Sequence, residues 1–512
     1  MPKKTGSARV AAPRRFAGCA RGALLLGLAA AACTGADEAP RRPNVLFVIV
    51  DDLRPTLGCY GDPVAVTPNI DAIAAEGMLF GRAYCQQAVC GPSRASVLTG
   101  CRPDTTGVKD LNTDFRDALP DVVTLPQLFK QAGYSTRAFG KVHHGGGRLD
   151  DLPSWSAPPW WPEGWRHYHT ERGRAIADDL VRRIAAAGRV EQPRGLAAEA
   201  PDVSDDVLVD GMIANEAIRV LGELEQPFFL AVGFKKPHMP FVAPRRYWEL
   251  IPEDAIRLAP GRSLPEGAPP CADSRSGEAR SYVDVPDEGP IDDETALRMI
   301  RGYYACVSHV DAMVGRLVAA LKAKGVWDDT IVVIWGDHGF HLGELGLFGK
   351  HTNYEEATRA PLIVRAPGVT FAGRRSDRLV ELVDLYPTLA ELAGLDLPEH
   401  LEGTSLVPLF TDPDRAWKQG AYSLFPRPVP GSGSLAGKRA VGRSVRTDRY
   451  RFTAWRLQGE IHATELYDYE AYPTTPVNLA HDPEYAEVAR RMRRILDEGW
   501  SAWRPPAPGA GG

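Results

Sequence analysis

A run of apolar residues that ends in two acids constrains the fold of this 512-residue chain more than any other feature. Residues 45–50 read Val-Leu-Phe-Val-Ile-Val, and Asp51 and Asp52 follow. A strand without polar alternation is buried on both faces, as in parallel sheets that carry helices on both sides. Similar runs stand at residues 228–234 and 331–335, with helical patterns between them at residues 70–76 and 310–322. The alternation predicts an α/β fold with a mostly parallel central sheet flanked by helices.

Residues able to do chemistry stand directly after the predicted strands. In open α/β sheets, ligands bind at the carboxyl ends of the strands. A further short strand is predicted at residues 135–140, so four strand ends contribute. The side chains that follow them are Asp51, Asp52, Lys141, His144, His238, Asp337 and His338. We therefore expect these side chains to meet at one edge of the sheet.

The chain is long enough for two domains, because one hydrophobic core stops growing at about 250–300 residues. Near residue 420 the pattern changes to short alternating segments, followed by an amphipathic helix at residues 485–500. We expect a large domain at residues 43–420 and a small C-terminal antiparallel sheet with a helix at residues 421–504. Residues 505–512, rich in Pro and Gly, are predicted to be a disordered tail. Two segments rich in Pro, Gly and charge are predicted to be surface insertions that govern specificity, at residues 155–165 and 252–290.

The first residues are typical of an export signal. Residues 1–32 contain six Lys and Arg residues and no acid, and their apolar run at 22–32 is too short to span a bilayer. The sequence Ala-Ala-Ala-Cys at residues 30–33 fits either a bacterial lipoprotein site, with a lipid anchor on Cys33, or ordinary signal cleavage. Residues 33–42 would then be a linker. We expect a bacterial protein that is periplasmic, anchored to the outer membrane, or secreted.

The charge balance excludes a general binder of polyanions such as nucleic acid. The formal net charge is −5, and removal of residues 1–32 with their six cations would make it about −11. An acidic protein repels nucleic acid. Affinity for an anionic substrate must therefore come from a local cationic pocket.

Cys90 begins a string that reads Cys-Gly-Pro-Ser-Arg, and Leu-Thr-Gly follows at residues 98–100. Pro92 suits the first turn of a helix, so we expect Cys90 at a helix start whose amides face an anion. Arg94 can form charge-assisted hydrogen bonds. The string resembles the signature of type I sulfatases, in which the cysteine is oxidised to formylglycine, an aldehyde. The alternative is an ordinary helix start with a buried or disulfide-bonded cysteine.

Further strings are similar to the same family. Residues 331–344, with Asp337 and His338, resemble its second hallmark, and Lys350 follows. Within the family, three strings are similar to iduronate-2-sulfatases and their bacterial relatives: residues 101–106, 140–144 and 236–241. The resemblance covers most of residues 43–480. It implies an alkaline-phosphatase-like large domain that is catalytic and hydrolyses sulfuric esters.

The resemblance also implies a metal site. One calcium ion would be bound by Asp51, Asp52, Asp337 and His338, together with the formylglycine derived from Cys90. Carboxylate oxygens suit a hard cation of this kind. An Asp at the end of a strand is, however, commonly only a turn or cap residue.

Five residues would carry the chemistry by the same resemblance. Hydration of the aldehyde gives a diol; one hydroxyl attacks sulfur, and the other later expels sulfate. Arg94 would hold the diol, and Lys141 and His144 would assist it. His238 and Lys350, with Lys141, would bind the sulfate and protonate or stabilise the leaving alcohol. His143 is the alternative to His144 by one position, and the family spacing favours His144.

Cysteine usage leaves the disulfide question open. Outside the export segment and Cys90, the cysteines form an odd set: Cys59, Cys85, Cys101, Cys271 and Cys306. An exported chain permits disulfides, but their pairing cannot be deduced from the sequence.

Three functions fit these residues. The leading one is a sulfatase that acts on a sulfated sugar, with a 2-O-sulfated uronic acid as one candidate, and that a formylglycine-generating enzyme matures. A phosphonate or phosphodiester hydrolase could use the same groups, because phosphoryl and sulfuryl centres share tetrahedral oxygens. A non-catalytic glycan-binding lipoprotein with an unmodified Cys90 is the third.

Overall fold

The computed structural model describes residues 42–505, except residues 146, 188–193, 430–436 and 475. The predicted export segment at residues 1–32, the proposed anchor at Cys33 and all but the first residue of the predicted tail lie outside the described residues. From Arg42 onward the chain forms one compact unit.

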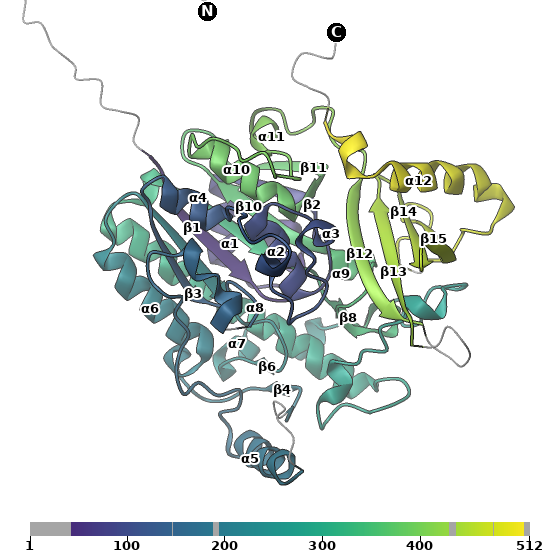
Figure 1. Ribbon diagram of the computed structural model, residues 1–512. Coiled ribbons are helices and arrows are strands. Elements are labelled where there is room, and N and C mark those ends of the chain that lie inside the picture. Colours follow the sequence, from purple (N-terminus) through teal and green to yellow (C-terminus); the bar gives the residue numbers. More distant parts are fainter. Residues whose placement is uncertain (1–41, 146, 188–193, 430–436, 475, 506–512) are drawn as a thin grey trace, which may run out of the picture. The chain divides into compact units, whose positions relative to one another are not determined.

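Seven strands form the central sheet, in the order β11-β2-β10-β7-β1-β5-β3 (Figure 1). Their bounds are β1 Asn44–Val50, β2 Met78–Tyr84, β3 Ser135–Gly140, β5 Phe228–Phe234, β7 Thr330–Gly336, β10 Arg359–Arg365 and β11 Arg374–Glu381. The neighbours β3, β5, β1 and β7 pair in parallel, whereas β10 runs antiparallel to β7 and β2. The prediction of a mostly parallel sheet is confirmed.

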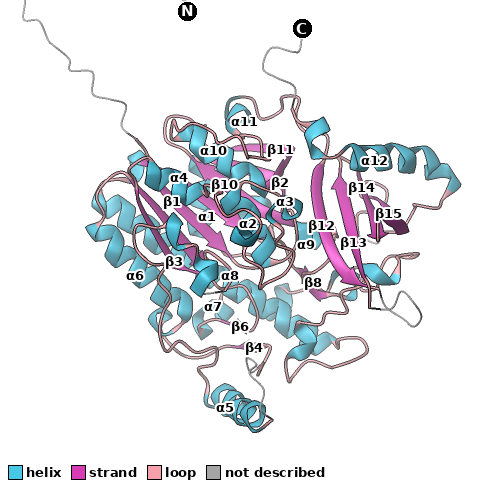
Figure 2. Ribbon diagram, viewed as in Figure 1, coloured by secondary structure: helices cyan, strands magenta, loops and turns pink. Residues whose placement is uncertain are grey.

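Side chains of β1 alternate between two apolar cores. Leu46 and Val48 belong to one core, and Val45 and Phe47 belong to the other. The helices of the first core include α1 (Pro68–Glu76), α6 (Val209–Glu223) and α8 (Asp293–Lys324). Those of the second include α2 (Cys90–Thr99), α4 (Leu125–Gln131) and α10 (Leu385–Leu392). Helices therefore cover both faces of the sheet, as Figure 2 shows in cyan. Burial on both faces explains why β1 lacks polar alternation.

A second, antiparallel sheet follows in the order β12-β13-β14-β15. Its strands are β12 Ala421–Pro428, β13 Arg439–Arg446, β14 Tyr450–Leu457 and β15 Glu460–Asp468. The amphipathic helix α12 (Ala486–Glu498) lies beside this sheet (Figure 1). Its Met492 and Ile495 share a core with Val445 and Phe452. The predicted C-terminal sheet and helix are thus present. The domain boundaries at 43–420 and 421–504 stay predictions.

The predicted surface position of the two insertions is only partly correct. Trp155, Cys271 and Ala279 are buried, although residues 252–290 form no helix longer than one turn. Their apolar side chains pack inward, which a segment's Pro and Gly content does not reveal. The six cysteines among the described residues are free, so no disulfide forms there.

One helix in the described part of the chain, α8, is long and apolar enough to span a bilayer. Of its most apolar stretch, 67% is buried inside the protein. Residues of α8 such as Val310 and Leu317 are part of the first core. The apolar side chains of α8 are therefore accounted for by packing in the first core.

Candidate active site

Adjacent strand ends bring the predicted acids together. The backbone N–H of Asp51, which follows β1, donates to the carbonyl of Phe234 at the end of β5 (3.1 Å). The N–H of Asp52 donates to Oδ1 of Asp337, which follows β7 (3.0 Å). Asp52 has a φ of 62°, in the left-handed region that Asp enters more readily than most residues. All three Asp side chains are buried at the carboxyl edge of the sheet, where the sequence predicted them.

Cys90 is the first residue of α2 and is buried. Its Sγ lies 3.4 Å from Nε2 of His338 and 3.6 Å from Nζ of Lys141. Val89, the N-cap, makes no side-chain cap, so no side chain competes there for the free amides of the first turn. Gly100 ends the helix with a φ of 72°, and a Cβ there would clash with Leu401. The signature therefore encodes a short helix that begins at Cys90.

Arg94 links three strand ends and is 1% exposed. Its Nε donates to Oδ2 of Asp337 (2.9 Å), and its Nη2 donates to Oδ1 of Asp51 (3.2 Å). Its Nη1 donates to the carbonyls of Lys141 and Val142. The guanidinium thus fixes two of the acids. The structure records no hydrogen bond from Arg94 to Cys90 among the described residues.

Lys141 and Lys350 add two further positive charges beside the three carboxylates. Nζ of Lys141 is paired with Asp51 and lies beside Cys90. Nζ of Lys350 donates to both carboxylate oxygens of Asp52, at 2.7 and 2.9 Å. Both lysines are at least nine-tenths buried, so their ammonium groups are held in place by the acids.

The site offers two overlapping groups of possible metal ligands. They are Asp51, Cys90, Asp337 and His338, and Asp51, Asp52, Cys90 and His238. Within each group, the ligand atoms lie within 4.8 Å of one another. Burial raises the pKa of Asp52 to about 8, with Lys350 opposing and Asp51 adding to the rise. Buried carboxylates that crowd in this way fit a hard cation such as calcium.

The two adjacent imidazoles differ in their surroundings. The ring of His143 is buried and packs edge-on against Trp155, with centroids 6.0 Å apart. His144 is partly exposed; burial and Lys141 lower its pKa to about 3, while Asp51 opposes. His144 therefore interacts electrostatically with the acid and the lysine of the site. This geometry favours His144 over His143.

Glu278 is a site residue that the sequence did not reveal. Its Oε2 lies 3.3 Å from Nζ of Lys350, and its Oε1 lies 3.3 Å from Nε2 of His238 and 3.4 Å from Nη1 of Arg194. Burial would raise its pKa, but Lys350 and His238 hold it well below its usual value. A Glu inside a Pro- and Gly-rich insertion carries no periodicity or motif, so no sequence signal could have found it.

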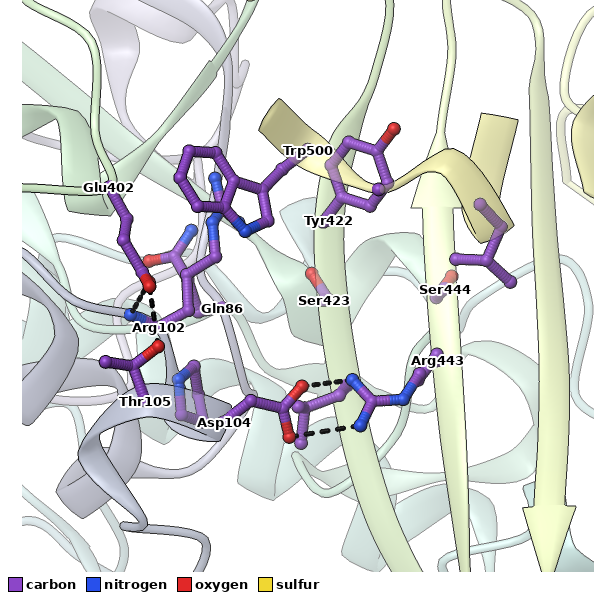
Figure 3. Close-up of a pocket in the computed structure, with 14 residues that line it drawn as sticks. Gln86, Arg102, Asp104, Thr105, Glu402, Tyr422, Ser423, Arg443, Ser444 and Trp500 are labelled. Atoms are coloured by element: carbon purple, nitrogen blue, oxygen red, sulfur yellow. Dashed lines mark hydrogen bonds and ion pairs between the residues drawn. The ribbon is translucent and has the colours of Figure 1, made fainter. Parts of the chain in front are cut away.

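A separate hollow of about 140 Å³ lies at the other end of the signature helix, against β12 and β13. Figure 3 shows that its carboxylates have protein partners: Asp104 pairs with Arg443, and Glu402 accepts from the Thr105 hydroxyl and the backbone N–H of Arg102. Among the described residues that line it, none is a predicted site residue. This hollow lies at the interface between the C-terminal sheet and the large domain.

Replacing Arg102 with methionine should lower the free energy of unfolding by about 3 kcal/mol, the usual cost of breaking a buried ion pair. Arg102 is 7% exposed and binds both oxygens of Glu381, at 2.7 and 2.8 Å. Urea unfolding monitored by fluorescence measures the change. Arg443→Met is the matched control, because its pair with Asp104 is about 40% exposed and should contribute under about 1 kcal/mol.

The same pair has a pH signature. Burial opposes ionisation of Glu381, but Arg102 and Lys418 lower its pKa to about 2. A depressed folded pKa contributes stability above the unfolded value of about 4.3, and this stability is lost as the pH falls. The stability gap between the wild type and Arg102→Met should narrow from about pH 4 toward pH 2. An unchanged gap over that range would contradict the assignment.

Two family models match the chain. The model described as Sulfatase matches residues 43–395, and the model described as N-sulphoglucosamine sulphohydrolase, C-terminal, matches residues 343–501. The first spans more than half of the chain. It includes the strand ends, Cys90 and Lys350.

Known proteins give the same result. Iduronate 2-sulfatase of Homo sapiens is 36% identical over 547 residues, which cover 91% of this chain and 98% of that protein. A protein solved in complex with its substrate D-glucosamine-2-N,6-O-disulfate superposes with a TM-score of 0.70 at 25% identity, covering 90% of this chain and 97% of its own. The phosphonate monoester hydrolase of Agrobacterium radiobacter superposes with a TM-score of 0.68 at 25% identity, and the match covers 89% of this chain and 95% of that protein. The expected alkaline-phosphatase-like architecture is confirmed, and the chain belongs to the sulfatase family of sulfuric ester hydrolases.

Proposed function

We propose that this chain is an exported, calcium-dependent sulfatase that removes sulfate from a sulfated sugar by means of a formylglycine derived from Cys90. The position of Cys90 carries the proposal: its Sγ lies 3.4 Å from His338 and 3.6 Å from Lys141, beside three buried carboxylates. A structural cysteine has no need of two cations and a set of metal ligands around it. Membership of the sulfatase family supports the same conclusion.

Two groups would complete the site. Formylglycine at position 90 would supply a hydrated aldehyde as the nucleophile toward sulfur. Calcium, bound by Asp51, Asp52, Asp337 and His338, would supply positive charge next to the sulfate oxygens. Both fit the donors at the site, where three carboxylates and two imidazoles lie within reach of the side chain at position 90.

Residues near Cys90 would prepare the nucleophile. Arg94 keeps Asp51 and Asp337 in place through the hydrogen bonds described above. Lys141 is protonated, because Asp51 raises its pKa although burial opposes this, and its Nζ donates toward the side chain at position 90. His144 has a lowered pKa and is neutral near pH 7, so its ring can accept a proton.

The other side of the site would serve the sulfate and the leaving alcohol. Burial opposes protonation of Lys350, but Asp52 raises its pKa well above the usual value, so Nζ holds its proton. It can donate that proton in a hydrogen bond to the leaving oxygen. The Nδ1 of His238 is hydrogen-bonded to the carbonyl of Met239 (2.6 Å), which directs Nε2 toward Glu278. Lys141, His238 and Lys350 are thus the proposed sulfate-binding residues.

The substrate and the location are further parts of the proposal. The human relative is named for a 2-sulfated iduronate, and the similar solved protein holds a sulfated glucosamine as its substrate. Both names support a sulfated sugar, with a 2-O-sulfated uronic acid as the first candidate. The N-terminal segment supports export, with Cys33 as a candidate lipid anchor, after a formylglycine-generating enzyme has modified Cys90.

A second candidate is the hydrolysis of phosphonate monoesters or phosphodiesters. The likeness to a phosphonate monoester hydrolase favours it, because that protein superposes almost as well as the sugar-bound one. A site of this kind could serve both reactions, since both leaving groups depart from a tetrahedral centre.

The test compares three esters with the protein coexpressed with a formylglycine-generating enzyme. The proposal predicts faster turnover of an aryl sulfate than of an aryl phosphodiester or an aryl phosphonate monoester, and loss of turnover on dialysis against a chelator with recovery on adding calcium. Faster turnover of a phosphorus ester would favour the second candidate. No turnover of any of the three by the modified protein would contradict both.

His144→Ala should lower kcat for an aryl sulfate by about 10²–10³-fold, the range for loss of a proton-transfer group. His143→Ala should change kcat less than tenfold and lower the melting temperature, because its ring fills space beside Trp155. Steady-state kinetics and thermal melts of both variants make the comparison. The opposite pattern would assign the role to His143.

A further inference from the structure

Lys235 is the first residue after β5 and is partly buried at the catalytic edge of the sheet. Its ammonium makes no hydrogen bond and no ion pair with any described residue. The nearby acid, Asp210, is already engaged, because its carboxylate accepts the backbone N–H groups of Lys235 (2.6 Å) and Lys236 (3.0 Å). The ammonium of Lys235 therefore has no directly bonded counterion among the described residues, although Asp51 and Asp210 attract it from a longer distance.

The other lysines of this edge differ. Lys141 is paired with Asp51, and Lys350 is paired with Asp52 and Glu278. Lys236 donates to the carbonyls of His238 and Pro240, at 2.9 and 2.5 Å. Even a partly buried ammonium loses hydration that such partners would replace. Lys235 is thus an exception that folding alone does not explain.

The surroundings of Lys235 add positive charge and an aromatic wall. Its Nζ lies 5.4 Å from the ring centroid of Trp165, and the ring of His167 lies 4.5 Å from that of Trp165. Nδ1 of His167 is buried without a partner among the described residues. Arg194, within electrostatic reach of His167, touches the carboxylate of Glu278, which Lys350 and His238 also face. Glu278 thus faces two cations, Lys350 and Arg194, and the imidazole of His238.

We propose that Lys235, assisted by Arg194 and His167, binds a second negatively charged group of the substrate, next to the sulfate that is cleaved. This inference rests on the proposed function and deepens it, since it assigns the substrate class: a sugar with at least two anionic groups. The second anion would be a carboxylate or another sulfate, which share the oxygen acceptors that an ammonium and a guanidinium recognise.

Energetics and position agree with the assignment. Burial and the neighbouring Lys141 and Lys236 lower the pKa of Lys235 to about 7, so a bound anion would remove repulsion and restore the full charge. The cation–π contact with Trp165 orients the ammonium but does not neutralise it. Lys235 follows the same strand as His238, a proposed sulfate-binding residue. Lys141, another proposed sulfate-binding residue, lies within electrostatic reach of Lys235, which places the second anion near the sulfate that is cleaved.

The experiment compares kcat/KM for five substrates in the full modified protein. They are an aryl sulfate, a 2-O-sulfated uronic acid together with its carboxyl-reduced counterpart, and a glucosamine 2-N,6-O-disulfate together with its 6-O-monosulfate counterpart. Lys235→Met should lower kcat/KM for a dianionic substrate by about 10–100-fold more than for its monoanionic counterpart, the value of one charge-assisted hydrogen bond. Lys235→Arg should restore most of the preference.

Lys322→Met is the matched control, since Lys322 also lies over a tryptophan, Trp327 (4.9 Å), at the far end of α8. Lys322→Met should leave the ratio of kcat/KM between each dianionic substrate and its monoanionic counterpart unchanged. A selective loss on the uronic acid would identify a carboxylate, and one on the disulfated sugar would identify a second sulfate; either supports the proposal. Equal losses on all substrates, or none, would overturn it. Sulfatase turnover by the wild type keeps this failure distinct from failure of the proposed function.

Discussion

Replacement of Cys90 by alanine is expected to lower kcat/KM for an aryl sulfate by at least about 10⁴-fold, the order of effect seen when an enzyme loses its nucleophile. The variant keeps the fold, because Cys90 is a small side chain at a helix start and alanine is a good helix former. Arg94, Lys141 and the three acids would remain in place around an unreactive side chain. Steady-state kinetics and a thermal melt measure the two effects.

Cys59→Ala is the control for this substitution. Cys59 is free and partly buried, lies in a short turn at Gly58–Tyr60, and is not among the groups of possible metal ligands. It should retain activity within about twofold. An alanine at position 90 that kept more than a few per cent of the wild-type activity would show that the reaction does not proceed through this residue.

Asp51→Asn is expected to lower kcat/KM by about 10³-fold or more and to abolish stabilisation of the protein by calcium. Asp51 is fully buried, belongs to both groups of possible metal ligands, and pairs with Lys141 and Arg94. Its neutralisation removes a charged ligand, leaves Lys141 without its acid and leaves Arg94 with Asp337 alone. Both the lost ligand and the uncompensated positive charge weaken calcium binding. Kinetics with added calcium and thermal melts with and without calcium measure both effects.

Asp311→Asn separates a site effect from general destabilisation. Asp311 is also a buried acid, but it accepts the backbone N–H groups of Asn69 (3.1 Å) and Ile70 (2.8 Å) at the start of α1, away from the strand ends. This control should lose stability while keeping its kcat and its response to calcium. If Asp51→Asn kept activity within tenfold and still gained stability from calcium, the assignment of Asp51 as a metal ligand would be wrong.

The sequence predicted the sheet edge well because burial leaves a strong pattern. A strand such as β1 must be apolar at every position when its side chains pack into two cores. The end of the strand, and the acids that follow it, can therefore be located to within one residue. Pro92, which suits the first turn of a helix, likewise predicted a helix that begins at Cys90. Strand order follows from tertiary packing, and the antiparallel β10 was therefore not foreseen.

Partners of the site residues could not be read from the sequence. Arg94 was expected to hold the nucleophile, yet its hydrogen bonds go to Asp51, Asp337 and two carbonyls, because several strand ends converge on it. Glu278 reaches the site from a segment without helical or strand periodicity. Lys235 lacks a directly bonded acid because the carboxylate of Asp210 accepts backbone N–H groups instead. The partners of these side chains depend on contacts between residues far apart in the chain, so no local sequence pattern indicates them.

The mass of the tryptic peptide that spans residues 83–94 tests the central claim most directly, because trypsin cleaves after Arg82 and Arg94. The peptide should come from protein made with a formylglycine-generating enzyme and assayed in parallel on an aryl sulfate. The account predicts a peptide in which the Cys90 thiol has been replaced by an aldehyde, with turnover that rises with the modified fraction. An intact thiol in a preparation that nevertheless turns over the sulfate ester at full rate would contradict it.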